Sequence, residues 1–139
     1  MNLGFRTHYP FEKLRETKFE QKILDGIKIH TIREDKFDRW VPGRLAHFCT
    51  GIRTKFYRCF KKDTIVSTQQ VRIVITKHSW GTVMSIYIEG KELPAVMHDQ
   101  FVRNDGFDSV WDFYAWFCPG KQSEMNGKIL HWTNFKYKL

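Results

Sequence analysis

The fold is decided by residues 23–33, which read ILDGIKIHTIR. Asp25 and Gly26 supply a stop for a helix, because glycine readily takes the left-handed conformation that ends one. Residues 28–33 then alternate and are rich in β-branched side chains, a pattern typical of a strand with one buried face. We therefore expect a short helix at about 18–25, followed by a strand at 28–33.

Local signals predict where the helices begin. Thr17 and Glu20 have the spacing of a capping box, in which the Thr side chain accepts from a helical N–H and the Glu side chain caps in return. A proline opens the helix that we predict over 94–104. Ser109 precedes a third, strongly apolar helix, which ends before a Pro-Gly pair, and it is better explained as the cap of this helix than as a nucleophile.

Alternating segments separated by turn residues predict the strands. The predicted strands cover 28–33, 44–50, 56–60, 65–76, 83–88 and 128–137. Strands interleaved with few short helices favour an α+β fold with a small closed or nearly closed barrel, since closure removes exposed sheet edges. Because no repeat or linker divides the chain, we expect one domain over 1–139.

The composition is that of a basic folded protein. The 23 Lys and Arg against 15 Asp and Glu give a net charge of +8, and 42% of the residues are hydrophobic. This balance excludes the disordered class, and no apolar run is long enough for a spanning helix. The three Cys form no Cys-x-x-Cys pair and the N-terminus carries no secretory signal, so we expect a soluble cytoplasmic protein with reduced thiols and no cofactor or metal.

Basic and aromatic residues are mixed in 55–58 and in 134–138. Cations bind phosphates and aromatic rings stack on bases, so this mixture is typical of a surface for single-stranded nucleic acid. A strand with one face in the core has the same alternation, and the two interpretations are compatible. Trp111 and Trp116 belong to the apolar helix and are expected in the core.

Four segments together resemble the ASCH family, a branch of the PUA-like superfamily. They are the run Gly-x-Lys-x-x-Thr-Ile-Arg at 26–33, a Pro-Gly pair at 42–43, DGFDS at 105–109 and GKILHW at 127–132. The likeness spans roughly 19–137. It implies a small PUA-like β-barrel with short helices at its rim, and a cleft for RNA or a modified nucleoside.

Some members of this family are similar to small amidohydrolases that remove the acetyl group from N4-acetylcytidine. The resemblance implies that Lys28 and Thr31 are the working residues, together with Asp105 as the acid where those hydrolases have a Glu. The expected ligand-binding residues are Arg33, Arg44 and Trp40. Arg33 suits a carbonyl or phosphate oxygen, because its guanidinium offers a fork of donors.

Amide hydrolysis needs an activated oxygen nucleophile and a base. The hydroxyl of Thr31 can attack if a neutral amine takes its proton, and burial together with the charge of Arg33 would make Lys28 neutral. Residues three apart point to opposite faces of a regular strand. The hypothesis therefore requires Lys28 to lie in the turn after Gly26 or at a bulge.

Other interpretations of the same residues stay open at this point. The protein could be a non-catalytic RNA-binding module, in which these side chains only hold the ligand, or a metal-independent ribonuclease. Thr31 could be an ordinary strand residue and Lys28 an exposed cation at the start of a strand. Asp105 could be a turn former ahead of Gly106.

Overall fold

The computed structural model describes all residues from 1 to 139 and has an α+β fold built mainly of strands. The strands are β1 (Asn2–Gly4), β2 (His8–Tyr9), β3 (Glu12–Glu16), β4 (His30–Arg33), β5 (Leu45–Thr50), β6 (Arg58–Thr64), β7 (Ser67–His78), β8 (Gly81–Ile88), β9 (Lys91–Glu92) and β10 (Gln122–His131). The helices are α1 (Phe19–Leu24), α2 (His98–Asn104), α3 (Val110–Phe117) and the 3₁₀-helix η1 (Ala95–Met97). None of the helices is long and apolar enough to span a membrane.

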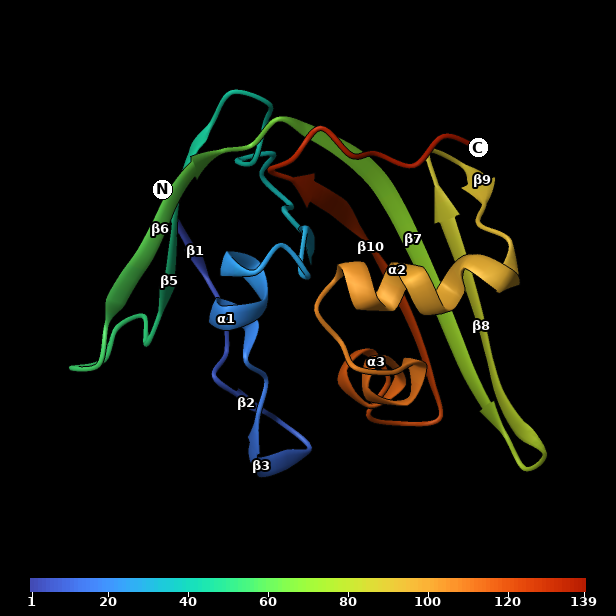
Figure 1. Ribbon diagram of the computed structural model, residues 1–139. Helices are drawn as coiled ribbons and strands as arrows, with labels where there is room; N and C mark the ends of the chain where they lie inside the picture. Colours follow the sequence, from blue (N-terminus) through green and yellow to red (C-terminus); the bar gives the residue numbers. More distant parts are fainter.

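The strands form three sheets (Figure 1). The largest has the order β4-β10-β7-β8-β9, the second has the order β1-β5-β6, and β2 pairs with β3. All neighbours are antiparallel except β1 and β5, which are parallel. The predicted barrel is not confirmed, because these pairings leave β4 and β6 as edge strands and do not close into one ring.

The core lies between the large sheet and the helices that cover one of its faces (Figure 1), and it extends to the second sheet through Leu3, Ala46 and Phe48. The alternating strands β7 and β8 point Ile73, Ile75 and Ile86 inward, and all three are buried. Helices α2 and α3 contribute Phe101 and Phe113, whose rings meet edge to face at 6.1 Å. Burial of such side chains is the main term that holds the helices on the sheet.

Several predicted boundaries are wrong at the ends of the chain. The last strand begins at 122 and ends at His131, whereas the prediction placed it over 128–137. In the segment that follows, the side chain of Gln69 takes the place of a strand partner for Tyr137: it donates to the carbonyl of Tyr137 and accepts from its N–H. The first three strands were not predicted at all.

The capping box at the start of α1 is also wrong. Lys18 occupies the capping position in a left-handed conformation, with φ of 58°, and no side chain caps the helix. The hydroxyl of Thr17 instead donates to the carbonyl of Arg6 at 2.7 Å. Glu20 pairs with Arg58 across the molecule at 3.2 Å. Glu20 therefore does not bond back to the helix end, whereas the Thr17 hydroxyl still accepts from the N–H of Phe19 at 3.4 Å.

The third helix begins as predicted, but one of its tryptophans does not lie in the core. Ser109 accepts from the backbone N–H of Asp112 at 3.3 Å, which confirms the cap. Trp111 is 69% exposed, because the first turn of α3 directs it away from the sheet. Trp116 is half-buried and packs against the core.

Candidate functional site

A cavity of about 170 Å³ lies where the segment after β1, helix α1, strand β4 and the turn before α3 meet. The polar and charged residues in its wall are Arg6, Lys28, Thr31, Arg33 and Asp105. Aromatic rings of Phe5, Phe19 and Trp116 complete much of the remaining wall. A cavity of roughly 150 Å³ holds a benzene ring. This one therefore has room for a single six-membered ring with polar groups at its edge.

Lys28 lies in the loop between Gly26 and β4, where the strand alternation has not yet begun. It is only 2% exposed, and its Nζ donates to the backbone carbonyls of His30, at 2.9 Å, and Asp105. The same nitrogen lies 3.6 Å from the carboxylate of Asp105. Burial lowers the pKa of Lys28 to about 8, although the charge of Asp105 opposes this shift.

Gly106 makes room for the Lys28 side chain. It has a φ of +95°, and a Cβ at this position would lie 2.7 Å from Cδ of Lys28 and 3.0 Å from the ring of Phe19. Other residues rarely adopt this backbone conformation, and here they would also displace the lysine. The glycine after Asp105 therefore leaves space for two side chains that line the cavity, Lys28 and Phe19.

Arg33 holds the opposite side of the cavity together. Its Nη1 donates to the hydroxyl of Thr31 at 2.7 Å, and its Nη2 donates to the carbonyl of Gly4, also at 2.7 Å. The guanidinium thus joins β4 to the end of β1. Thr31 and Lys28 both line the cavity, but no hydrogen bond joins them, because each is bonded to other groups.

A buried polar chain extends from Asp105 away from the cavity. The Oδ1 atom of Asp105 lies 3.1 Å from Nδ1 of His30, and Nε2 of His30 lies 2.8 Å from the hydroxyl of Tyr137. Burial lowers the pKa of His30, which favours the neutral ring. Because a carboxylate only accepts, Nδ1 carries the proton and Nε2 accepts from Tyr137. Asn104 in turn donates to this hydroxyl at 3.1 Å.

Sequence reasoning missed this chain because its members are far apart. His30 and Tyr137 are 107 positions apart, and Asp105 is 75 positions from His30. The only local signal was that His30 stands inside the run that carries Lys28 and Thr31. Its burial in the polar chain depends on the C-terminal segment, for which the prediction was a strand.

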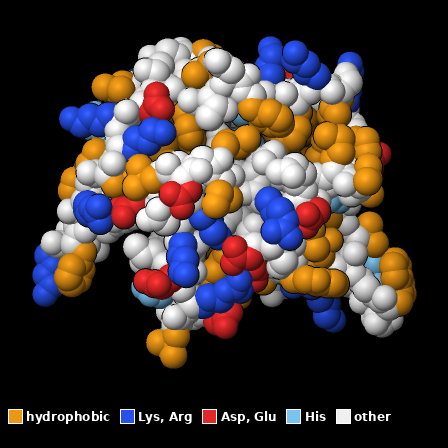
Figure 2. Space-filling model, in the orientation of Figure 1, with side chains coloured by type: hydrophobic (Ala, Val, Ile, Leu, Met, Phe, Trp, Pro, Cys, Tyr) orange, Lys and Arg blue, Asp and Glu red, His pale blue; other side chains and the backbone are white.

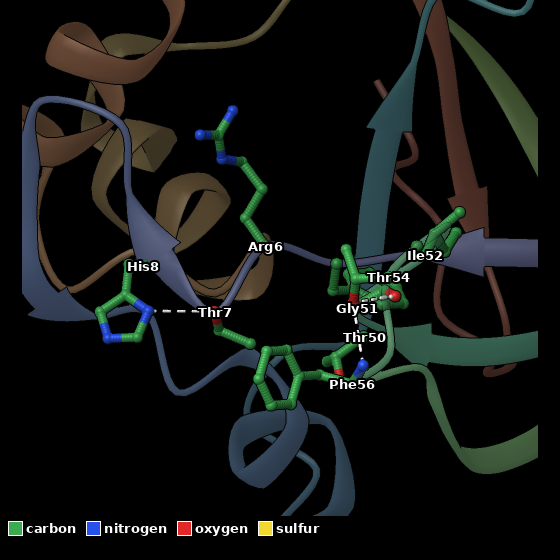
Figure 3. Close-up of a pocket in the computed structure, with 10 residues that line it drawn as sticks. Arg6, Thr7, His8, Thr50, Gly51, Ile52, Thr54 and Phe56 are labelled. Atoms are coloured by element: carbon green, nitrogen blue, oxygen red, sulfur yellow. Dashed lines mark hydrogen bonds between the residues drawn. The ribbon is translucent and has the colours of Figure 1, made fainter.

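A wider groove of about 750 Å³ adjoins the cavity, and the two share Gly4, Phe5 and Arg6 in their walls. Its other wall is the loop between β5 and β6, from Thr50 to Phe56 (Figure 3). The ring of Phe56 points from this loop toward Thr7, and it is 73% exposed. Figure 2 shows the surface hollowed between the β5–β6 hairpin and the β2–β3 hairpin.

The structure does not bring the remaining two predicted residues to the cavity. Trp40 is buried elsewhere; its carbonyl accepts from Lys128 at 3.1 Å and its N–H donates to Asp35 at 2.9 Å. Arg44 is exposed in the turn before β5, and its carbonyl accepts from Ile65. Both residues support the loop that leads into β5 and do not line the site.

Comparison of the chain with known proteins identifies no relative. No protein-family model matches the chain, no curated protein sequence matches it, and no solved structure matches it. No group of three or more His, Cys, Asp or Glu side chains is placed to hold a metal ion. The chemistry of the site is therefore argued from the side chains in its wall.

Proposed function

We propose that this protein binds a pyrimidine nucleoside, either free or within single-stranded RNA. The observation that carries the proposal is that Lys28, Arg33 and Asp105 border a cavity with room for one ring, directly beside a large open groove. A pyrimidine base has one ring and fits this volume. The sugar and phosphate then lie in the groove.

The groups in the wall suit the edge of a pyrimidine. The ammonium of Lys28 and the guanidinium of Arg33 are donors for the carbonyl oxygen of the base or of an acyl group on it. The carboxylate of Asp105 accepts from an exocyclic amine. Phe5, Phe19 and Trp116 provide aromatic surface for contact with the base.

Membership of the ASCH family, with the two larger sheets as parts of a PUA-like barrel, belongs to the same proposal. It is supported by the position of the run Gly-x-Lys-x-x-Thr-Ile-Arg, because its Lys28, Thr31 and Arg33 all line the cavity. Asp105, from the second segment of the likeness, lies beside them. A cytoplasmic location is part of this proposal as well.

Hydrolysis of an N-acyl pyrimidine nucleoside is the second candidate function, and the pKa of Lys28 near 8 favours it, since part of the amine is neutral near physiological pH. After rotation of the Lys28 side chain toward Thr31, the amine takes the hydroxyl proton and the Thr31 oxygen bonds to the acyl carbon. The C–N bond then breaks, and Lys28 returns the proton to the leaving exocyclic amine. Water hydrolyses the Thr31 ester, which releases the carboxylic acid.

The experiment compares binding and turnover in one set of variants. Purified protein is titrated with cytidine by calorimetry and incubated with N4-acetylcytidine and a short acetylated RNA, with products read by mass spectrometry. We expect Lys28→Met to lose binding, and turnover if there is any. The control is Lys36→Met, since the Lys36 side chain is 78% exposed and outside the cavity.

Three outcomes separate the candidates. Deacetylation by the wild type that Lys28→Met abolishes supports hydrolysis. Binding without turnover supports the binding function alone, and an affinity for RNA that falls steeply with salt then shows phosphate contacts in the groove. If neither cytidine nor RNA binds, or if Lys28→Met binds as the wild type does, the cavity is not a nucleoside site.

A further inference from the structure

Two cysteines lie directly opposite each other on the hairpin that borders the groove. Cys49 in β5 pairs in register with Cys59 in β6, just beyond the bulge in this ladder. Opposite residues of an antiparallel pair have Cα atoms about 4.5–5.5 Å apart and side chains on the same face. A disulfide requires Cα atoms about 4.4–6.8 Å apart. The pairing of Cys49 with Cys59 is therefore of the kind whose usual Cα spacing falls within the range that a disulfide requires.

The two thiols differ in their exposure to solvent, so we expect them to have different roles. Cys59 is exposed on an edge strand. Cys49 is buried, and its Sγ lies 3.7 Å from the carbonyl of Leu3. Burial and the neighbouring Cys59 both raise the pKa of the Cys49 thiol. An oxidant in solution thus meets Cys59 first, while Cys49 lies behind it as a second thiol.

The third cysteine, Cys118, is not part of this pair. Cys118 is buried at the end of α3, where its Sγ lies 3.4 Å from the carbonyl of Gly120. It belongs to the part of the chain that packs against β7, away from the β5–β6 hairpin. The structure therefore provides one close pair and one isolated thiol that serves as an internal control.

We propose that Cys49 and Cys59 form a redox-active dithiol that a low-molecular-weight disulfide such as oxidised glutathione converts to an intrachain disulfide. The thiolate of Cys59 attacks oxidised glutathione, which gives a mixed disulfide and releases one glutathione thiolate. Cys49 loses its proton to solvent and attacks the Cys59 sulfur of the mixed disulfide. The Cys49–Cys59 bond forms and a second glutathione leaves, so the protein is oxidised by two electrons and glutathione disulfide is reduced.

The bond would close the loop that forms one wall of the groove. Thr50, Ile52 and Phe56 all line the groove and lie between the two cysteines in sequence. A cross-link at the base of this loop removes conformational freedom from it. Oxidation of the pair would thus fix the groove wall, whatever ligand the groove binds.

The test treats the whole reduced chain with oxidised glutathione and follows it by intact mass and thiol titration. We expect the mass to fall by two hydrogen atoms and the titratable thiols to fall from three to one. Trypsin cuts within the loop, after Arg53 or Lys55, and the resulting fragments should stay joined until a reductant is added. Cys118→Ser should be oxidised as the wild type is.

Two further variants distinguish the roles of the thiols. Cys49→Ser should stop at a glutathione adduct on Cys59, whereas Cys59→Ser should stay free of glutathione, because its Cys49 is buried. The proposal is overturned if the wild type accumulates the stable adduct without closing the bond. It is equally overturned if two chains join through Cys59, or if the wild type keeps three free thiols.

Discussion

The ammonium of Lys28 lies 3.6 Å from the carboxylate of Asp105, and both side chains are almost completely buried. A buried ion pair is tolerated when the remaining donors and acceptors are also satisfied. Here the carbonyl of His30 accepts from Lys28, and the ring of His30 donates to Asp105. His30 thus supports both partners, so substitution of either member of the pair reports on the site.

The charge of Lys28 makes the stability of the protein depend on pH. Its pKa is about 8 in the folded protein against an ordinary value of 10.5, so between these values the unfolded chain holds a proton that the folded protein has lost. Stability therefore rises with pH in this window. Relative to Lys28→Met, the wild type should gain roughly 3 kcal/mol of unfolding free energy from about pH 8 to about pH 10.5.

Urea denaturation at both ends of the window measures this gain. The comparison of wild type with Lys28→Met cancels the contribution of tyrosine titration to the stability, because both proteins retain the tyrosines. One of these is Tyr9, whose pKa is raised to about 12. Lys36→Met serves as the control, because its exposed side chain should give no such change across the window. A difference between wild type and Lys28→Met that stays constant over this range would show that the folded protein does not lower the pKa of Lys28.

Replacement of Asp105 by Asn should leave a buried cation without its counter-charge. We expect Asp105→Asn to lose roughly 3–5 kcal/mol of unfolding free energy at neutral pH. The pKa of Lys28 should fall further, because the charge of Asp105 raises it. Asp99→Asn is the matched control: Asp99 forms an exposed ion pair with Arg103 at 2.9 Å, and its loss should cost about 0.5 kcal/mol.

Chemical denaturation of the two Asn variants checks this difference. Equal, small losses of unfolding free energy in Asp105→Asn and Asp99→Asn would mean that the backbone carbonyls of His30 and Asp105 are enough to stabilise the ammonium of Lys28. The carboxylate would then be dispensable for folding.

The parts of the fold that local signals specify were predictable. Alternation predicted β7 and β8, and the serine cap predicted the start of α3. Strands β1 to β3 gave no such signal, because they are short; β1 is held by β5, which is distant in sequence, and β2 and β3 pair only with each other. The capping box failed for a similar reason, because Glu20 pairs with Arg58, which is distant in sequence, and not with the helix end.

The residues of the candidate site were likewise predictable only where they lie close together in the sequence. Lys28, Thr31 and Arg33 come from one short run, so a single motif was enough to predict them together. Tyr137 and Arg6 reach the site region from the two ends of the chain, and no local pattern marks them. Arg44 and Trp40 do not line the cavity, because their proximity in sequence to β4 and β5 does not bring their side chains to it.

The cap of α3 should contribute measurably to the free energy of unfolding. Ser109 accepts from the N–H of Asp112, whose carboxylate is bound by Arg15 at 2.6 and 2.8 Å. Removal of an N-cap hydroxyl typically costs about 1 kcal/mol, so we expect this loss for Ser109→Ala, while Ser109→Asp should retain most of the stability. Ser79→Ala, at an exposed turn, should change the unfolding free energy by less than about 0.5 kcal/mol. Thermal denaturation that ranks the two alanine variants equally would contradict the cap.

Arg33 should be irreplaceable even by another cation. Two of its nitrogens bind Thr31 and Gly4 at once, and a lysine has one amine in place of this planar fork. We expect Arg33→Lys to weaken the binding of cytidine by about tenfold or more, which corresponds to about 1.4 kcal/mol. The matched control is Arg44→Lys, because Arg44 is exposed and outside the cavity and should bind cytidine as the wild type does. Calorimetric titration measures both affinities, with a melting curve to show that each variant is folded.

If a folded Arg33→Lys retained full affinity for cytidine, or if both variants lost it equally, the binding site for the base would lie elsewhere on the surface.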